Sequence, residues 1–295
     1  MKVIMIDAFK PEYIKHAPYL KSLTNNYQWG ELEMIPGHGG PMEIFFKGRT
    51  NKLALFYKKK KSSLKWIKHF TWLDNYGKTG RFIIDSIINL QRLIQGKELY
   101  RTGQIPLKKL HKLDFAVNMP PYNGLNVEYK YFKDLDSIGH KYGTKSQEII
   151  QAIRKVDKEV SKLKFDVILS DHGMIDIKKT IKVPQTKNCF LDSDIARYWG
   201  TEQELKKIKQ NLPLKEGKII DWPDKRFGQL IFLANPGNLI LPNYWQRKSK
   251  VKAMHGYDGK HKDLRAFYII KKKGKRKDLK IKELHNIVFS KELHK

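Results

Sequence analysis

Residues 165–174 read Phe-Asp-Val-Ile-Leu-Ser-Asp-His-Gly-Met, an apolar run that ends in an aspartate and a histidine. A short apolar run of this kind predicts a buried strand. Ligands of open α/β sheets bind beyond the carboxyl ends of the strands, so we expect Asp171 and His172 to face a crevice there. The N-terminus repeats the pattern, because apolar residues 3–6 lead directly into Asp7. The two segments predict an α/β sheet with metal-ligand residue types gathered at one edge.

Two further segments carry the same residue types. Asp136 and His140 lie four residues apart, and we expect them in a polar loop ahead of a helix; His255 follows a basic loop. Each residue alone is explained as readily by a cap or a loop, so the prediction rests on their conjunction. Asp with His favours zinc, manganese or iron over calcium, which prefers oxygen ligands alone. Six such side chains are too many for one tetrahedral zinc but suit two divalent ions, which would clamp the oxygens of a phosphoryl group.

Three of the segments resemble the motifs of a known family. Residues 136–143 read Asp-Ser-Ile-Gly-His-Lys-Tyr-Gly, residues 170–174 read Ser-Asp-His-Gly-Met, and residues 255–258 read His-Gly-Tyr-Asp. In type and order they resemble the type I phosphodiesterase and nucleotide pyrophosphatase branch of the alkaline phosphatase superfamily. The resemblance implies an α/β fold with a mixed sheet flanked by helices on both faces, in one domain spanning residues 1–295.

The resemblance also implies a two-metal centre that acts on a phosphate ester, and a diester more than a monoester. The ions would be zinc, with manganese as the alternative. The implied ligands of one ion are Asp136, His140 and His255, and those of the other are Asp7, Asp171 and His172. Two other functions stay open: a degenerate member that binds a phosphorylated ligand without turnover, and a nucleic-acid-binding protein, which charge alone supports.

The nucleophile is where the sequence departs from the family, which places a Thr or Ser after the first strand, at the start of a helix. Residues 33–48 contain no Ser, Thr or Cys. Aligning on Pro36 and His38 puts Met34 at the nucleophile position, whereas aligning on Gly48 puts His38 there. Met34 cannot attack phosphorus. His38 offers an imidazole as nucleophile, acid, base or additional ligand; zinc-activated water and loss of activity are the alternatives.

The same loop is predicted to bind an anion. Gly39 and Gly40 allow a close approach of the backbone, and Pro41 fits the first position of a helix whose amide groups would face the site. Arg197, with aromatic neighbours, is a second candidate for binding substrate, although packing explains it equally well. These residues complete the set of candidate site residues.

Composition indicates an anionic partner. The 295 residues include 59 Lys and Arg against 30 Asp and Glu, a net charge of +29. Phosphate esters, acidic lipid and nucleic acid all fit such a charge. The single cysteine, Cys189, excludes an internal disulfide framework and fits a reducing cytoplasm. The N-terminus has no signal-peptide pattern and no apolar stretch approaches 18 residues, so a cytoplasmic location is expected, with peripheral contact at the inner face of the membrane as an option.

Two cap insertions are predicted, near residues 51–130 and 176–250. In the first, Lys58–Lys61 precede Ser62 and Ser63 as a helix cap, followed by helices over residues 64–73 and 82–94. This insertion is either a cap packed on the core or a basic amphipathic surface that docks on an anionic leaflet. In the second, a helix begins at Thr201 and a strand covers residues 229–234.

Overall fold

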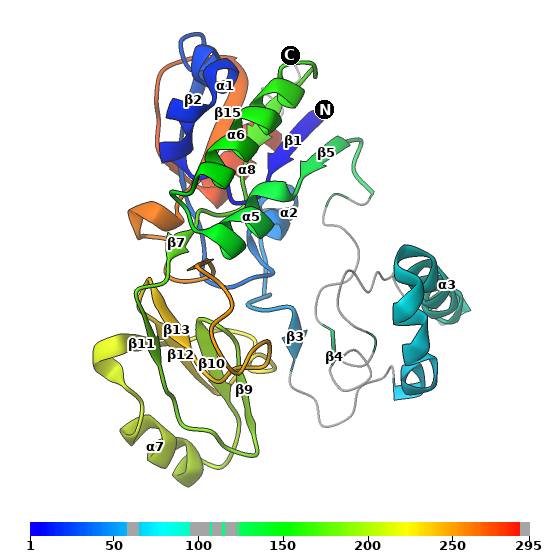
Figure 1. Ribbon diagram of the computed structural model, residues 1–295, viewed down its shortest axis with the longest axis vertical. Coiled ribbons are helices and arrows are strands. Elements are labelled where there is room, and N and C mark those ends of the chain that lie inside the picture. Colours follow the sequence, from blue (N-terminus) through cyan, green and yellow to red (C-terminus); the bar gives the residue numbers. More distant parts are fainter. Residues whose placement is uncertain (58–64, 95–106, 108–113, 116–121, 123, 290–295) are drawn as a thin grey trace.

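The computed structural model describes residues 1–57, 65–94, 107, 114–115, 122 and 124–289. Two parts of the structure are visible, a helix-flanked sheet that contains the N-terminus and a smaller sheet next to it (Figure 1). The basic run Lys58–Lys61 and the predicted cap at Ser62 and Ser63 lie outside the described residues.

A six-stranded mixed sheet forms the centre of the larger layer. Its order is β16-β2-β15-β6-β1-β5. Strand β1 is parallel to β5 and β6, whereas β15 is antiparallel to both β6 and β2. The carboxyl ends of β1, β2, β5 and β6 therefore lie at one edge of the sheet. The strands are β1 (Lys2–Ile6), β2 (Tyr27–Glu33), β5 (Glu128–Phe132), β6 (Val167–Leu169), β15 (Ala266–Lys273) and β16 (Leu279–Lys280).

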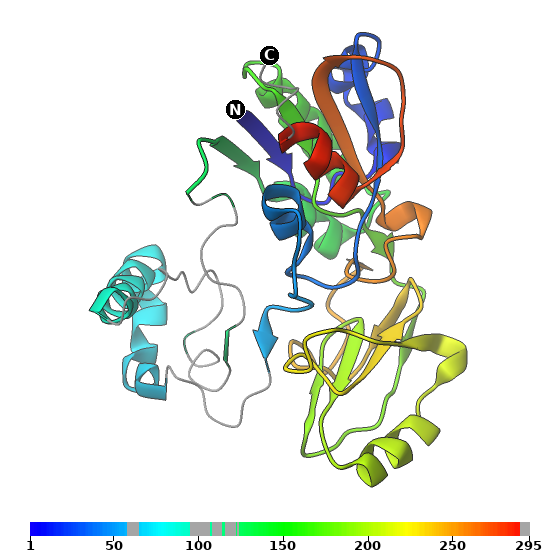
Figure 2. The same cartoon turned by 180° about the vertical axis from the view of Figure 1, so that it is seen from behind.

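Helices cover both faces of this sheet (Figures 1 and 2). Alternate residues of β1 point to opposite faces, as strand geometry requires. Ile4 and Ile6 pack with the 3₁₀ helix η1 (Pro11–His16) and helices α1 (Pro18–Leu23), α5 (Asp134–Tyr142) and α6 (Gln147–Val160). Val3 and Met5 pack instead with α2 (Pro41–Lys47) and α8 (Ile281–Phe289). The predicted mixed sheet with helices on both faces is confirmed.

The second insertion forms a separate antiparallel sheet of four strands, in the order β11-β12-β10-β9. Helix α7 (Glu202–Gln210) begins as predicted at Thr201, whose side chain forms a capping box with Glu204. The remaining elements between β6 and β15 are β7 (Ile175–Asp176), β8 (Lys179–Ile181), β9 (Cys189–Leu191), β10 (Ile195–Tyr198), η3 (Leu214–Glu216), β11 (Gly217–Ile220), β12 (Leu230–Ala234), β13 (Asn238–Ile240), β14 (Ala253–Met254) and η4 (Lys262–Leu264).

The first insertion lies to one side of both sheets (Figure 1). It contains β3 (Phe56–Tyr57), β4 (Asp114–Phe115), η2 (Lys65–Tyr76) and α3 (Gly77–Ile94). Both predicted helices are present, with two corrections: the first is a 3₁₀ helix, and the second starts five residues earlier than its apolar pattern. Ile67, Leu73, Ile84 and Ile88 hold the two together in a small apolar cluster.

Candidate metal centre

The six predicted ligands lie at the carboxyl edge of the large sheet. Asp7 directly follows β1, and Asp171 and His172 follow β6. Ser170 is fully buried and ties this edge together, because its hydroxyl donates to the Phe9 carbonyl and accepts from the Phe267 amide. The strand-end rule therefore correctly predicted where these side chains lie.

The backbone bends sharply where β1 ends. Ala8 has a φ of 57°, a left-handed conformation that is uncommon for a residue other than glycine. In this conformation the Ala8 amide donates to Asp171 Oδ1 over 3.4 Å. Strained residues of this kind persist where the surrounding structure determines them, and they cluster at functional sites. The bend links the Asp7 segment to the Asp171 segment.

Asp136 and His140 form the next part of the centre with His255. They lie in helix α5 and not in the loop that we expected. Their spacing of four residues places both side chains on one face of that helix. His140 Nε2 is 3.3 Å from Asp136 Oδ1, and His255 Nε2 is 3.4 Å from the same oxygen. The helix thus points the two side chains at His255, which directly follows β14.

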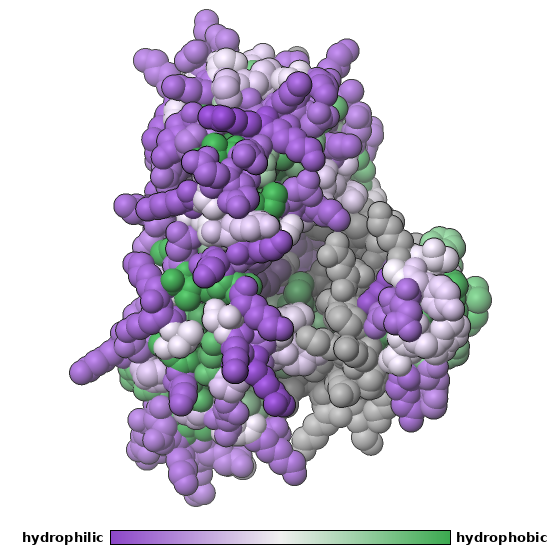
Figure 3. All heavy atoms as spheres, in the orientation of Figure 1, coloured by the Kyte–Doolittle hydropathy of each residue, from purple (hydrophilic) through white to green (hydrophobic). Residues whose placement is uncertain are grey.

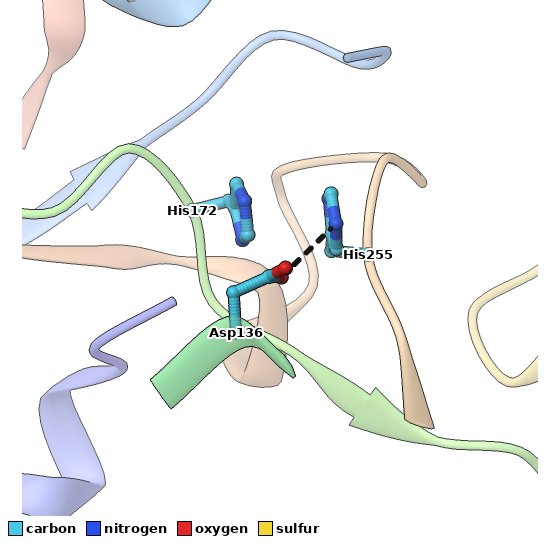
Figure 4. Close-up of side chains that lie close together, drawn as sticks. All are labelled: Asp136, His172 and His255. Carbon is cyan, nitrogen blue, oxygen red and sulfur yellow. Dashed lines mark ion pairs between the residues drawn. The ribbon is translucent and has the colours of Figure 1, made fainter. Parts of the chain in front are cut away.

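His172 lies between the two predicted ligand sets. Its Nε2 is 3.3 Å from Asp7 Oδ1 and 3.5 Å from Asp171 Oδ2. Its ring also stacks on that of His255, with centroids 3.6 Å apart, beside the Asp136 carboxylate (Figure 4). Donor atoms within 4.8 Å of one another form two groups among the described residues, one of Asp136, His172 and His255 and one of Asp7, Asp171 and His172. The predicted division gave His172 to the second set alone, whereas the structure places it in reach of both.

Backbone carbonyls orient two of the imidazoles. His140 Nδ1 is 2.8 Å from the Ala253 carbonyl, and His172 Nδ1 is 3.1 Å from the Gly173 carbonyl. A carbonyl accepts a hydrogen bond, so Nδ1 carries the proton and Nε2 has a free lone pair. This arrangement is typical of metal-ligating histidines, whose second nitrogen donates to a carbonyl or carboxylate.

Unpaired buried atoms at the same place fit a divalent ion. Among the described residues, Asp7 Oδ1 and Asp136 Oδ1 are buried without a hydrogen-bond partner, although imidazole nitrogens lie 3.3–3.4 Å from each of them. Such groups are nearly always satisfied in native proteins, so an unpaired set calls for an explanation. Carboxylate oxygens and imidazole nitrogens are the donors that zinc accepts. The residues present therefore fit the two-ion site that the sequence predicted.

The charges of the metal-free centre oppose one another. Burial, together with the neighbouring Asp171 and Asp136 carboxylates, raises the pKa of Asp7 well above its ordinary value. Burial lowers the pKa of His255 well below its ordinary value, and the nearby His172, His38 and His140 lower it further. These two shifts favour neutral Asp7 and His255 unless a cation is added, whereas Asp136 and His140 favour each other's charged form, because against the effect of burial His140 lowers the pKa of Asp136 and Asp136 raises that of His140.

This electrostatic conflict predicts that Asp7→Asn stabilises the metal-free protein. The pKa of Asp7 is higher in the folded chain, so its ionisation costs folding free energy once the pH exceeds its ordinary value of about 3.9. The amide removes that cost, and we expect a gain of about 1 kcal/mol in the free energy of unfolding. Urea unfolding with a chelator between about pH 5 and pH 8 measures it, since the gain should grow as pH rises toward the raised pKa. A variant less stable than wild type under these conditions would show that ionisation of Asp7 does not cost folding free energy.

His38 pairs with an aspartate that the sequence reasoning missed. His38 Nε2 is 2.7 Å from Asp194 Oδ1, and the rings of His38 and His255 are 5.0 Å apart. Burial would lower the pKa of His38, but the Asp194 carboxylate outweighs it and raises the pKa to about 9. Gly256, with a φ of 93°, makes room for the pair, because a Cβ there would lie 2.5 Å from Asp194 Oδ2. The one clue in the sequence was the acidic Asp192-Ser193-Asp194 run, which sequence reasoning left without a role.

Met34 is the residue that one of the two alignments of this loop puts at the family's nucleophile position. It directly follows β2, at the same sheet edge as Asp7, and only 5% of its surface is exposed. It packs in the core with Leu32 and Phe45. Met34 does not line the cavity beside the metal centre, whereas His38 does, so the structure does not favour Met34 over His38 at the family's nucleophile position.

Packing explains Gly40 in the loop that was predicted to bind an anion. Pro41 is the first residue of α2, as expected. A Cβ at Gly40 would lie 2.4 Å from the Ile35 side chain and 2.8 Å from the Lys52 carbonyl, so Gly40 is needed for packing. Neither Gly39 nor Gly40 lines the cavity beside the metal centre, whereas His38 does.

Of the two explanations offered for Arg197, the structure favours packing over contact with a substrate. Arg197 is fully buried in β10, where it donates to the Phe56 and Phe227 carbonyls and pairs with Asp192. Its guanidinium lies over the Phe190 ring, so the aromatic neighbours pack against it. The residue does not line the cavity; Asp192, its ion-pair partner, does. Arg197 therefore holds the second insertion together and does not meet a substrate directly.

The cavity next to the metal centre has a volume of about 510 Å³. One part of its wall is polar and includes the site histidines and Asp136. Another part is apolar and consists of Leu55, Trp245, Val251 and Met254, with Lys250 among them. The cavity thus joins a charged end to an apolar end, which suits a ligand with both characters.

Comparison with known proteins supports this assignment. The family model described as type I phosphodiesterase / nucleotide pyrophosphatase matches residues 107–213, which include the Asp136 and Asp171 motifs. The match confirms the resemblance to this branch of the alkaline phosphatase superfamily that the motifs predicted. The family is one of phosphodiesterases and pyrophosphatases.

Solved structures show the same fold. Murine ectonucleotide pyrophosphatase / phosphodiesterase 5, determined both on its own and as an inactive variant in complex with AMP, and the human protein each align with a TM-score of 0.64 at 14% identity. Each alignment covers 98% of this chain and 93% of the other. The alkaline-phosphatase-like fold is thereby shown over nearly the whole chain.

Proposed function

We propose that the chain is a two-metal-dependent phosphodiesterase. The observation that carries the proposal is the convergence of Asp7, Asp136, His140, Asp171, His172 and His255 on one sheet edge, with buried donor atoms left unpaired. When bound there, divalent ions supply positive charge that polarises a phosphoryl oxygen and stabilises the leaving oxygen. Zinc suits this mixture of imidazole and carboxylate donors best, and manganese is the alternative.

The cavity favours a diester over a monoester. A diester has a second organic group, and the apolar wall of Leu55, Trp245 and Met254 provides a place for it beside the charged end. Besides the ions and the histidines, Lys250 is the one lysine or arginine among the described residues that line the cavity, so the chain itself adds little charge to balance the second negative charge of a monoester. We therefore assign phosphodiesters with one apolar or aromatic substituent as the substrate class.

His38 and Asp194 are the chain's own acid–base pair in this proposal. Asp194 is fully buried and engages Nε2 of His38, so contact with a substrate falls to Nδ1. His38 lines the cavity and lies beside the His255 ring. The aspartate holds the ring in place, and the imidazole exchanges a proton with an attacking or leaving oxygen.

A second function is favoured by one observation, the lack of any Ser, Thr or Cys in residues 33–48. A chain without that hydroxyl would keep the metal centre and the cavity and would bind a phosphorylated ligand without turnover. The inactive variant of the murine protein was solved in complex with AMP, so binding of a nucleotide without turnover is possible in this fold.

Cleavage of bis-p-nitrophenyl phosphate separates the two functions. We expect metal-stripped protein to be inactive and zinc or manganese to restore release of p-nitrophenolate. Saturable zinc binding without release from mono- or diesters would instead identify a binding protein. Isothermal titration with AMP then tests whether that protein holds a phosphorylated ligand.

A further inference from the structure

Helix α3 exposes a large apolar surface. Among the described residues, eight of the thirteen exposed large apolar side chains lie on η2 and α3. We call these eight the α3 face; they are Trp72, Tyr76, Phe82, Ile83, Ile87, Leu90, Leu93 and Ile94. Phe82 is 73% exposed and Ile94 is 80% exposed. Apolar side chains lie along the outer side of this helix (right of Figure 3).

The helix is reversed relative to an ordinary surface helix. Three of its polar residues, Asp85, Asn89 and Arg92, are half-buried and have interaction partners, while Ser86 and Gln91 are exposed. Ile84 and Ile88 already supply the apolar contacts to the rest of the insertion. A surface helix normally turns its polar residues to water, and a contiguous exposed apolar surface marks an interaction site. The α3 face therefore serves a partner outside the chain.

Charge indicates what that partner is. Residues 58–112 contain fourteen Lys and Arg against three acidic residues, and the whole chain carries +29. A second copy would bring the same positive charge to the contact, so self-association is opposed. An amphipathic segment with basic residues and with Trp and Tyr beside the apolar side chains is typical of a helix that lies in the interface of an anionic bilayer.

We propose that the α3 face docks on the surface of an anionic membrane. Phe82, Leu90 and Leu93 enter the boundary between headgroups and acyl chains, while Lys68, which is exposed on η2, contacts the lipid phosphates. Among the described residues no helix is long and apolar enough to cross a bilayer, and the docking proposed here needs none. The proposal does not depend on the phosphodiesterase activity.

Vesicle sedimentation with the full chain tests the proposal. We expect binding to phosphatidylcholine vesicles that contain phosphatidylserine, weaker binding at high salt, and little binding to phosphatidylcholine alone. The double variant Leu90→Asp/Leu93→Asp should bind roughly tenfold or more weakly, because it puts charge into the apolar contact. Leu214→Asp is the matched control: Leu214 is 53% exposed but lies in the second insertion, so its variant should bind like wild type.

The opposing results are equally specific. Equal binding by the double variant and the control would show that charge alone attracts the protein, and would overturn a role for the α3 face. A dimer in sedimentation velocity that the double variant abolishes, without vesicle binding, would make a second copy the occupant. Far-UV circular dichroism should be unchanged in both variants, since all three leucines are exposed.

Discussion

His172→Ala should lower metal-dependent phosphodiester cleavage by on the order of 10³-fold or more. His172 is the residue that both groups of donor atoms share, with its Nε2 3.3 Å from Asp7 Oδ1 and its ring stacked on His255. Its loss would weaken the hold on both ions, and metal stabilisation of the transition state amounts to several kcal/mol, where each 1.36 kcal/mol is tenfold in rate. Initial rates with bis-p-nitrophenyl phosphate at saturating zinc measure the effect.

His69→Ala is the matched control for this experiment. His69 lies exposed on η2, away from the sheet edge, so we expect its variant to keep wild-type rates. If His172→Ala retained more than about a tenth of the wild-type rate at every zinc concentration, His172 would not be a shared ligand. An equal loss in both variants would point to a general effect on folding.

His38→Ala and Asp194→Asn should each lower the turnover number by roughly 10²-fold, the scale of lost acid–base catalysis. The two side chains form one unit through the 2.7 Å contact between His38 Nε2 and Asp194 Oδ1. Residues that act as a unit are not additive, so the double variant should be no slower than the slower single variant. Comparison of the four turnover numbers, with zinc content measured for each protein, gives the result.

Additive losses in this cycle would mean that the two residues act separately. Unchanged turnover in His38→Ala would make His38 a structural residue, and the acid–base assignment would fall. A zinc content that drops along with the rate would instead identify His38 as an additional ligand.

Local sequence patterns were sufficient for strands β1 and β6 and for the placement of the side chains that follow them, Asp7, Asp171 and His172. Apolar runs at residues 3–6 and 165–169 ended in polar residues, and parallel pairing of β1 with β6 brought those ends together. We expected Asp136 and His140 in a loop, whereas they lie in helix α5. Gly139 is needed within that helix, since a Cβ there would lie 2.6 Å from Met174 Sδ. The packing of Met174 against helix α5 therefore accounts for the glycine within it.

Contacts between distant segments were beyond the sequence. His38 and Asp194 are 156 residues apart and meet because the second insertion folds against the loop after β2. Arg197 looked like a substrate ligand because Arg beside aromatic residues fits an anion site, yet the fold buries it against Asp192 and Phe190. A single sequence does not say which charged residues the tertiary structure pairs with one another.

A crystal structure of zinc-loaded protein, with anomalous scattering recorded at the zinc edge, tests the central claim most directly. We predict two ions about 3.5–4 Å apart, the separation of two-metal phosphoryl-transfer centres. One should contact Asp136, His140 and His255, and the other Asp7 and Asp171, with His172 bound to one of them. No ion at this sheet edge, or a single ion with Asp7 unbound, would contradict the account.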